Sequence, residues 1–445
     1  MTSLIYNKLK SKYEGKKILV VGLGLQGGGI GLVKFFSEFG AYVKITDKKK
    51  EEDLLTSINQ IKGFKNISFR FGGHFLEDFL NADIIFKGPS VPWSLPEIIA
   101  AQKKGIPIEM EMAFVAKYFP GKIIGITGSR GKSTTTSMIY YILKDFKYNV
   151  FLGGGMPGIS TIHYLKTASK DSWLVAELAS WSLSGFHRLK ISPHIAVFTS
   201  FYPDHLDYYK NLDDYFYDKA AIFLYQKNSD FLIANKKLKS AIEKYQTLGK
   251  KIYFKKDDFK EKLSYLVGEH NLENAAAALK LAMILNLDLE KAIEIIKNFP
   301  GLPFRLQKVK EKNGILFIND TTSTTPVATM KAIDAFSNKK IILILGGNSK
   351  NLPFDELIKK LKKVEKIILL AGSFTKEIMP ILIQNYKEKC FGPFDDLKKA
   401  VLEAYKIGLG FNEAVILFSP GATSFAMFNN EFHRGEEFNK IVSQL

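Results

Sequence analysis

The residues whose types and spacing most directly suggest chemistry lie in residues 123–136, IIGITGSRGKSTTT. An apolar run predicts a short buried strand, a glycine-rich turn follows, and the next residues predict a helix. Glycines let backbone N–H groups approach phosphate oxygens, and a helix N-terminus adds positive potential. Lys132 could reach the terminal phosphates, and Ser133 could offer a hydroxyl to Mg²⁺. The predicted phosphate-binding set is Gly128, Ser129, Arg130, Gly131, Lys132, Ser133 and Thr134.

The spacing of this loop leaves an alternative open. Two residues separate Gly128 from Gly131, whereas the standard phosphate loop places four residues between its glycines. A glycine-rich turn before an ordinary helix is therefore the competing interpretation. The order of strand, turn, GKS and helix favours the phosphate loop.

The composition indicates a globular protein of several domains. The chain has 445 residues, 46% of them hydrophobic and 24% charged, values that are ordinary for a soluble protein. No apolar run reaches the length of a membrane span, and the first residues lack the apolar region of a secretory signal. Cys390 is the single cysteine, which excludes an internal disulfide. We expect a cytoplasmic protein.

The formal net charge of +18 raises the question of nucleic acid. The lysines are scattered along helix faces and interspersed with aspartate and glutamate, and no aromatic-basic RNA motif is present. A lysine-rich surface that serves anionic substrates explains the charge. We therefore expect small anionic substrates, no nucleic acid and no membrane span. We also expect a monomer.

The N-terminal third begins with a nucleotide-binding pattern. Residues 17–23, KILVVGL, predict a buried strand, and Gly22, Gly24 and Gly27 follow in GLGLQG. A helix and a second strand lead to Asp47, so the pattern matches a dinucleotide fingerprint. An NAD-dependent dehydrogenase is one interpretation of this third. The same strand, turn and helix can hold any pyrophosphate, including that of a nucleotide sugar.

The central and C-terminal thirds add further strand ends that carry polar groups. Glu177 ends the predicted strand at residues 173–178, where its carboxylate could coordinate Mg²⁺ facing the phosphate loop; a surface glutamate is the alternative. After a Gly- and Pro-rich linker at residues 300–305, predicted strands at residues 340–345, 366–370 and 414–418 alternate with helices. They predict a second parallel α/β unit, with ligand-binding loops at the carboxyl ends of its strands.

Several segments together resemble the Mur ligases. The short phosphate loop among them also resembles that of folylpolyglutamate synthetases. The segments are TGSRGKSTTT, ELASWSL, YPDHLD, GEHNLEN, FINDTTSTTP and SPGATS, and they cover nearly the whole chain in the family's order. The resemblance implies an α/β fold of three domains. These are a Rossmann-like, UDP-sugar-binding domain (residues 1–117), a central P-loop ATPase-type domain with a parallel sheet (118–300) and a Rossmann-like, amino-acid-binding domain (301–445).

The resemblance is greatest to the glutamate-adding branch of this family. It implies ATP-dependent ligation of glutamate, D-glutamate in the first place, to UDP-N-acetylmuramoyl-L-alanine in cytoplasmic peptidoglycan precursor synthesis. The reaction runs through an acyl phosphate and gives ADP and phosphate. The implied cofactors are ATP and two Mg²⁺ ions.

The resemblance also implies site residues. Lys132, Glu177, His205 and Lys219 would be catalytic, with Lys219 as a carbamate that requires an amine of lowered pKa. The metal ligands would be Ser133, Glu177, His205 and Lys219. ATP would be bound by the phosphate loop together with Asn271, Asn274, Arg305 and Asp320. The substrates would be bound by Gly22, Leu23, Gly24, Thr46, Asp47, Ser180, Ser182, Thr322, Lys350, Ser424 and Phe425.

Ordinary structural roles compete with these assignments. The DHLD segment could be a surface turn with a capping aspartate, Lys219 an ordinary solvated lysine, and the asparagines at residues 271 and 274 a helix cap.

The sequence departs from the family pattern at several positions. Gly155 stands where an asparagine is usual, Ser182 where a glutamine is, and Thr322 where a lysine near the incoming glutamate is. Phe304 replaces a histidine, and Glu431 replaces an aromatic residue. These departures leave three alternatives open: an L-glutamate-adding or other Mur-type ligase, an NAD-dependent dehydrogenase, and a non-catalytic nucleotide-binding regulator.

Overall fold

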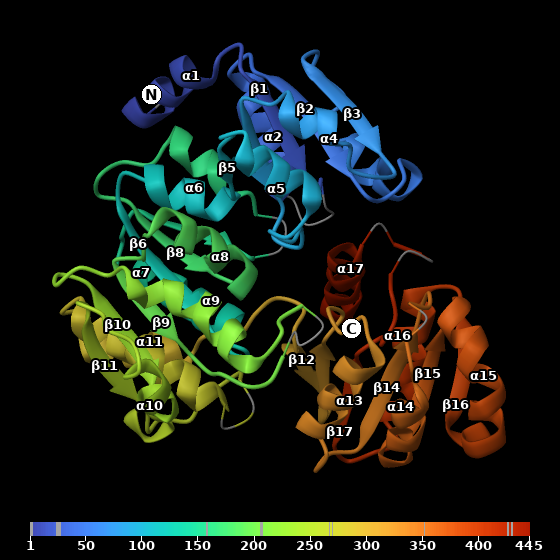
Figure 1. Ribbon diagram of the computed structural model, residues 1–445. Coiled ribbons are helices and arrows are strands. Elements are labelled where there is room, and N and C mark those ends of the chain that lie inside the picture. Colours follow the sequence, from blue (N-terminus) through green and yellow to red (C-terminus); the bar gives the residue numbers. More distant parts are fainter. Residues whose placement is uncertain are drawn as a thin grey trace. The chain divides into compact units, whose positions relative to one another are not determined.

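The computed structural model describes residues 3–23, 28–156, 159–204, 208–266, 268, 270–350, 352–424, 427–428 and 430–445 (Figure 1). It consists of two compact units, residues 1–261 with 269–296 and residues 262–268 with 297–445. In the part of the chain that is described, the strands form three sheets, two in the first unit and one in the second. The expected three-domain α/β architecture is therefore confirmed, while the boundaries after residues 117 and 300 stay a prediction.

The N-terminal sheet is parallel, with strand order β3-β2-β1-β4-β5. Its elements are α1 (Leu4–Tyr13), β1 (Lys17–Val21), α2 (Gly28–Glu38), β2 (Tyr42–Asp47), α3 (Leu55–Ile58), β3 (Ile67–Phe71), α4 (Leu76–Leu80), β4 (Ile84–Lys87), α5 (Pro96–Lys103), β5 (Ile108–Glu109) and α6 (Glu111–Tyr118). Alternate residues of β1 serve two cores, since Ile18 and Val20 belong to one and Leu19 and Val21 to the other. The strand order reverses between β1 and β4, which is where open α/β sheets bind ligands.

The central sheet is also parallel, with strand order β11-β10-β9-β6-β8-β7. Its elements are β6 (Lys122–Thr127), α7 (Lys132–Asp145), β7 (Val150–Gly154), the 3₁₀ helix η2 (Thr161–Lys166), β8 (Trp173–Glu177), α8 (Ser180–Leu189), β9 (Ile195–Phe198), α9 (Leu212–Leu224), β10 (Phe231–Asn235), α10 (Lys239–Ile242), β11 (Lys250–Phe254), α11 (His270–Ile284) and α12 (Leu289–Lys297). Strand β6 lies between β8 and β9. The glycine-rich loop after β6 therefore emerges between the carboxyl ends of those two strands.

The N-terminal and central sheets share one continuous hydrophobic core. Phe114 of α6 makes ring contacts with Phe36 of α2 and Phe86 of β4, and the same core continues into Leu165 and Leu174 of the central region. Burial of large aromatic side chains is strongly stabilising. This shared core fixes the loops of the first sheet relative to those of the second.

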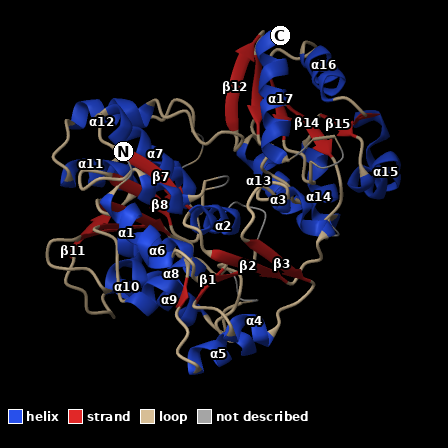
Figure 2. Cartoon of the chain, turned by 90° about the horizontal axis from the view of Figure 1, so that it is seen from above, coloured by secondary structure: helices blue, strands red, loops and turns tan. Residues whose placement is uncertain are grey.

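The C-terminal sheet has strand order β12-β13-β17-β14-β15-β16 and helices on both faces (Figures 1 and 2). Its elements are β12 (Gln307–Lys312), β13 (Ile315–Asn319), α13 (Pro326–Ala335), β14 (Ile341–Gly346), α14 (Asp355–Lys360), β15 (Lys366–Leu370), α15 (Ser373–Tyr386), β16 (Cys390–Phe394), α16 (Leu397–Gly408), β17 (Ala414–Phe418) and α17 (Glu431–Gln444). The expected parallel unit is confirmed for β13 to β17. The additional strand β12 is antiparallel to β13, so the sheet is mixed.

The β12–β13 hairpin has a signal that the sequence interpretation overlooked. Asn313 and Gly314 both have positive φ, 53° and 74°, as a two-residue Asn-Gly hairpin turn requires. The strand QKVKEK before the turn is rich in charged residues and protects an edge of the sheet.

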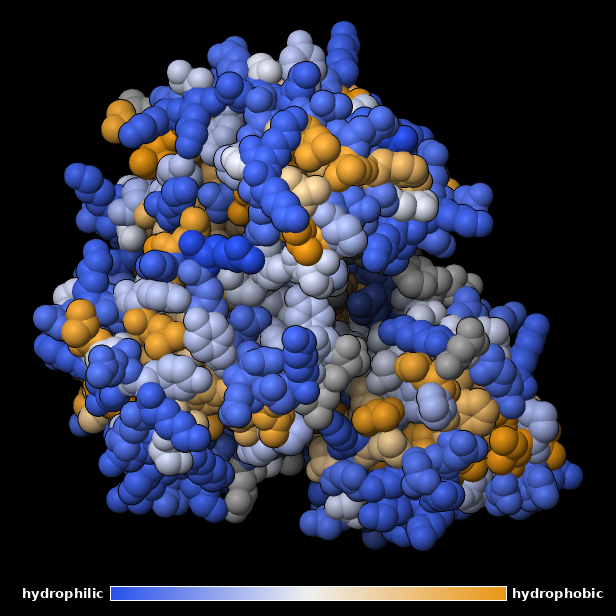
Figure 3. Space-filling view, in the orientation of Figure 1, coloured by the Kyte–Doolittle hydropathy of each residue, from blue (hydrophilic) through white to orange (hydrophobic). Residues whose placement is uncertain are grey.

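The lysine-rich composition is reflected in a largely hydrophilic surface. On the face drawn in Figure 3, hydrophilic side chains predominate and hydrophobic ones form separate patches. Many lysines pair with carboxylates, for example Lys291 with Asp145 at 2.6 Å and Lys340 with Glu365 at 2.8 Å. Within the described ranges, none of the helices combines the length and apolar character needed to cross a bilayer.

Phe36→Ala tests the shared core. Phe36 is fully buried and its ring contacts Tyr13, Phe86 and Phe114, so the substitution removes packing from three elements and should destabilise the protein by about 3 to 5 kcal/mol. Leu4→Ala is the matched control, because Leu4 is 86% exposed and its loss should cost less than about 0.5 kcal/mol. Urea denaturation followed by circular dichroism measures both. Equal midpoints for the two variants would contradict the assignment of Phe36 to the core.

Candidate functional site

The glycine-rich loop joins β6 to α7 through two glycines that other residues could not replace. Gly128 has φ 151° and Gly131 has φ 83°, which side chains strain to adopt. A Cβ on Gly128 would lie 2.1 Å from Thr199 Oγ1, and one on Gly131 would lie 2.4 Å from Asn274 Oδ1. Helix α7 begins at Lys132, so Lys132 and Ser133 belong to its first turn.

The loop is held in place by the segment that follows β9. Ser129 N donates to Ser200 O at 2.8 Å and Arg130 N donates to Ser200 Oγ at 2.9 Å. Thr199 Oγ1 donates to Arg130 O at 2.6 Å. Because these two loop N–H groups are used inside the protein, the N–H groups at the start of α7, which have no partner within the helix, are the better placed to bind a phosphate.

One asparagine of α11, Asn274, lies against this loop, and a second, Asn271, is hydrogen-bonded to Asn274. Asn274 Oδ1 accepts a hydrogen bond from Thr135 Oγ1 at 3.2 Å, and its Nδ2 donates to Asn271 Oδ1 at 3.0 Å. Both asparagines are buried. The structure thus shows Asn274 supporting the loop, while contacts of Asn271 and Asn274 with ATP stay a prediction.

Two lysine side chains converge on one carbonyl oxygen of the loop. Lys132 Nζ and Lys219 Nζ each donate to Gly128 O at 3.0 Å. Lys219 is 1% exposed, and burial together with the nearby charge of Lys132 lowers its pKa to about 7. The pair concentrates positive charge beside the loop, and a large fraction of Lys219 is neutral near pH 7.

Glu177 ends β8 beside this loop, in register with Ile126 of β6. It is buried, and its Oε2 has no hydrogen-bond partner among the described residues. A buried carboxylate oxygen without a partner is costly. The carboxylate of Glu177 and the hydroxyl of Ser133 are oxygen ligands of the kind that Mg²⁺ takes, so these residues fit a magnesium site.

Part of the predicted metal site lies outside the described residues. His205 lies outside the described residues, and within them no group of three or more histidine, cysteine, aspartate or glutamate side chains is arranged to hold a metal. Glu177 and Lys219 are brought close enough for the carboxylate to influence the pKa of the amine. Their roles as metal ligands stay predictions.

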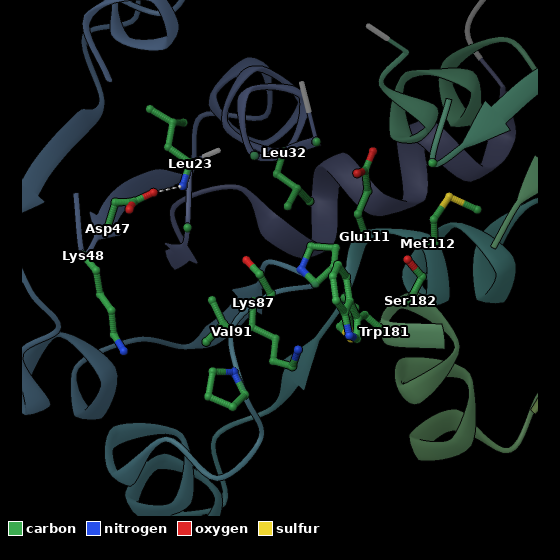
Figure 4. Close-up of a pocket in the computed structure, with 18 of the residues that line it drawn as sticks. Leu23, Leu32, Asp47, Lys48, Lys87, Val91, Glu111, Met112, Trp181 and Ser182 are labelled. Carbon is green, nitrogen blue, oxygen red and sulfur yellow. Dashed lines mark hydrogen bonds between the residues drawn. The ribbon is translucent and has the colours of Figure 1, made fainter. Parts of the chain in front are cut away.

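A cavity of about 500 Å³ lies between the loops of the N-terminal and central sheets (Figure 4). Of the predicted substrate residues, Gly22, Leu23, Asp47 and Ser182 line it. Asp47 holds the glycine loop, since its Oδ2 accepts from Leu23 N at 2.9 Å. The cavity is thus assembled from residues of both the N-terminal and the central regions.

Two of the predicted substrate residues, Thr46 and Ser180, are not among the described residues that line the cavity. Thr46 is fully buried and donates through Oγ1 to Gly73 O. Ser180 is also buried and is not among the described residues that line the cavity. Gly24 lies outside the described residues.

Two titratable residues to which sequence reasoning assigned no role also line the cavity. Glu111, the first residue of α6, accepts a hydrogen bond from Ile162 N at 3.3 Å, and burial raises its pKa to about 7. Lys87, the last residue of β4, is 1% exposed, and burial lowers its pKa to about 7. For Lys87 the available signal was its position at the end of an apolar strand.

In the second unit, the loops after β13, β14 and β17 meet at one edge of the sheet. Thr423 N donates to Asn348 O at 2.9 Å, and Lys350 Nζ donates to Thr324 Oγ1 at 2.8 Å. Ser424 is buried, and its Oγ has no hydrogen-bond partner among the described residues. The edge therefore brings Lys350 and Ser424 together with the 320–325 loop.

The other predicted residues of this unit have structural contacts of their own. Thr322 Oγ1 donates to Phe304 O at 2.8 Å. Asp320 accepts from Ser419 Oγ and Leu306 N, and burial raises its pKa to about 6. Arg305 is exposed, and Phe425 lies outside the described residues.

Arg434 of α17 joins two of these loops, a role that the sequence interpretation missed. It is 1% exposed, donates through Nε to Thr321 Oγ1 at 2.8 Å and through Nη2 to Thr321 O at 2.9 Å, and also reaches Ala422 O. Gly435 allows this approach, because a Cβ there would clash with Phe304 and Thr321. The Arg-Gly pair in the sequence was the available signal.

Family models match most of the chain. Residues 16–109 match the Mur ligase MurD-like N-terminal domain, residues 126–282 the Mur ligase middle domain, and residues 304–421 the Mur ligase glutamate ligase domain. The three matches follow the order of the three sheets.

Relatives match over nearly the full length. The UDP-N-acetylmuramoylalanine–D-glutamate ligase of Roseiflexus sp. (strain RS-1) is 33% identical, over 96% of this chain and 98% of the relative. That of Borreliella afzelii (strain PKo) is 34% identical, over 96% and 97%. Among solved structures, MurC from Thermotoga maritima superposes with a TM-score of 0.55 at 19% identity, covering 96% of this chain and 99% of that one. MurF from Thermotoga maritima, in complex with ADP, superposes with a TM-score of 0.54 at 18% identity, covering 98% and 97%.

Gly131→Ala tests the phosphate loop. The added Cβ would meet Asn274 Oδ1 and would force a left-handed backbone on alanine, so affinity for ATP should fall roughly tenfold or more. Gly63→Ala is the control, because its Cβ would meet nothing within 4 Å. Calorimetric titration with ATP measures both, and unchanged affinity in Gly131→Ala would show that the loop is not the nucleotide site.

Proposed function

The chain belongs to the Mur ligase family, and we propose that it joins D-glutamate to UDP-N-acetylmuramoyl-L-alanine with the conversion of ATP to ADP and phosphate. The observation that carries this proposal is the near full-length similarity, at 33% and 34% identity, to relatives named as D-glutamate ligases. The phosphate loop, the cavity and the loop cluster of the second unit supply the three kinds of site that the reaction needs. We place the reaction in the cytoplasm and expect a monomer.

The reaction has two steps. The alanine carboxylate attacks the γ-phosphorus of ATP, which forms an acyl phosphate and releases ADP. The amine of glutamate then attacks the acyl carbon, phosphate leaves, and the amine loses a proton as the amide bond forms. Both steps pass through highly anionic states, so the site must supply positive charge.

The residues of the phosphate loop supply that charge. The N-terminus of α7 binds phosphate oxygens, and Lys132 stabilises the charge on the γ-phosphoryl group during transfer. The hydrogen bonds that Arg130 makes with Ser200 and Thr199 fix the loop beforehand, so little reorganisation accompanies binding.

The metal site is proposed from the donors around this loop. Ser133, Glu177 and His205 would hold magnesium, and bound magnesium would neutralise charge on the phosphates. Two ions are proposed on the basis of the family resemblance. Lys219 would serve as a carbamate, because its pKa of about 7 leaves a neutral amine available for CO₂.

The cavity of the first unit is proposed to bind the uridine nucleotide. Asp47 holds Leu23 of the glycine loop, and the carboxyl edge between β1 and β4 is the usual ligand position in such sheets. The Trp181 and Ser182 end, on the central side, would then receive the muramoyl-alanine part. Binding of a nucleotide sugar explains the GLGLQG pattern without a dehydrogenase activity.

The second unit is proposed to bind glutamate. Lys350 and Ser424 are suited to a carboxylate, and the unsatisfied Ser424 Oγ is available for it. Asn271, Asn274, Arg305 and Asp320 are proposed to act in ATP binding, and Thr322 and Phe425 in glutamate binding. Domain boundaries after residues 117 and 300 complete the proposal.

A coupled assay tests the function. Purified protein with ATP, Mg²⁺ and UDP-N-acetylmuramoyl-L-alanine should release phosphate when D-glutamate is added, and mass spectrometry should detect the extended product. Lys132→Ala is the control, with activity lower by on the order of a hundredfold or more. Activity with L-glutamate and none with D-glutamate would establish the L-glutamate alternative instead. Tight binding of NADH without ligation would support the dehydrogenase.

Lys219→Ala tests the carbamate. Removal of the amine should abolish phosphate release, and added acetate or another short carboxylate should restore part of it, because a carboxylate can replace the anionic end of a carbamate. Phosphate release at saturating substrates, with and without the carboxylate, measures the rescue. Wild-type activity in this variant would remove Lys219 from the site, and a loss without rescue would indicate a structural role.

A further inference from the structure

Lys87 occupies the point of the N-terminal sheet where a ligand is expected. It is the last residue of β4 and is in register with Val21, the residue before Gly22 of the glycine loop. The strand order reverses between these two strands, and ligands of open α/β sheets bind outside the carboxyl ends of strands at that point. Lys87 lines the cavity described above, and its side chain extends toward Trp181 (Figure 4).

The surroundings of Lys87 satisfy its charge poorly. Only 1% of the residue is exposed, and its Nζ makes one long hydrogen bond, 3.3 Å, to Gly88 O and lies 4.6 Å from the centre of the Trp93 ring. No carboxylate among the described residues forms an ion pair with it. A buried ammonium group without an anionic partner is costly, so a side chain that served only packing would be better apolar.

Charged groups face Lys87 from several elements without pairing with it. Asp218 of α9 attracts its charge and Arg188 of α8 repels it, both beyond ion-pair distance. Arg188 also lies against the Trp93 ring, 4.4 Å from its centre. Glu111 of α6 lines the same cavity, as do Asp47, Lys48, Lys49 and His74 of the β2 and β3 ends.

We propose that Lys87 binds the diphosphate of the uridine nucleotide and is the buried cation that neutralises it. This inference rests on the proposed function for the identity of the ligand. Gly28 and Gly29, the first residues of α2, line the same cavity. A diphosphate there faces the N-terminus of α2 on one side and Lys87 on the other.

Ligand binding then takes up a proton. Burial lowers the pKa of Lys87 to about 7 in the free protein, and an adjacent diphosphate raises it again. Below about pH 7 the amine is already charged and binds most tightly. Above that pH, binding must add the proton, so affinity falls as the pH rises. Glu111, whose pKa is also about 7, becomes an anion over the same range and weakens binding in the same direction.

Calorimetric titration with UDP separates these contributions. Lys87→Met should raise the Kd for UDP roughly tenfold to a hundredfold, should leave the weak binding of uridine unchanged, and should remove the proton uptake of Lys87. Proton uptake is obtained by titration at about pH 8 in two buffers of different ionisation enthalpy. Glu111→Gln keeps the Lys87 contribution and removes that of Glu111. Lys103→Met is the matched control, since Lys103 is an exposed lysine of α5 outside the cavity.

The outcomes distinguish this inference from the proposed function. Equal Kd values for UDP in wild type and Lys87→Met overturn the inference, as does wild-type binding of UDP without proton uptake, a measurement that needs no variant to fold. A loss seen with UDP-N-acetylmuramoyl-L-alanine but not with UDP overturns the diphosphate assignment. Lys87-dependent binding of UDP in a protein that shows no ligation supports the inference while the proposed function fails. With saturating substrate, Lys87→Met should retain the wild-type kcat within about threefold, and only KM should change.

Discussion

Two lysine side chains share one carbonyl oxygen, that of Gly128, and this contact sets the charge beside the glycine-rich loop. Lys132 reaches it from the start of α7 and Lys219 from the middle of α9. Two like charges so close together are unfavourable unless an anion or deprotonation relieves them. The lowered pKa of Lys219 is one form of relief, and a nucleotide phosphate would be the other. The loop therefore offers positive charge to an anion, and a bound anion would relieve the repulsion between the two lysines.

The same logic extends to the cavity of the first unit. Lys87 and Glu111 are both buried there, one as a cation and one as an acid, and burial moves the pKa of each toward neutrality. The two sheets whose loops form the cavity walls share one continuous core. The aromatic packing around Phe36 therefore has a consequence for ligand binding as well as for stability, since it sets the separation of the two sets of loops.

In the second unit, the buried side chain of Arg434 holds two loops together. Arg434 donates to Thr321 Oγ1, Thr321 O and Ala422 O, so the loops after β13 and β17 are joined through main-chain oxygens and one hydroxyl rather than through a carboxylate. A guanidinium with such partners retains much of its positive potential. The edge that carries Lys350 and Ser424 is consequently rigid and attractive to an acidic ligand.

The sequence by itself determined the elements and their order, because hydrophobic runs and glycines are local properties: the strand before Gly128, the helix after it and the parallel strands of the second unit follow from them. It also indicated Glu177 and Lys219, through motifs. Only the tertiary structure decided that Thr46 is fully buried and hydrogen-bonded to the main chain, that Lys87 and Glu111 enter the cavity, and that Arg434 joins two loops. Burial and hydrogen-bond partners depend on which distant segments meet, and no local pattern specifies that.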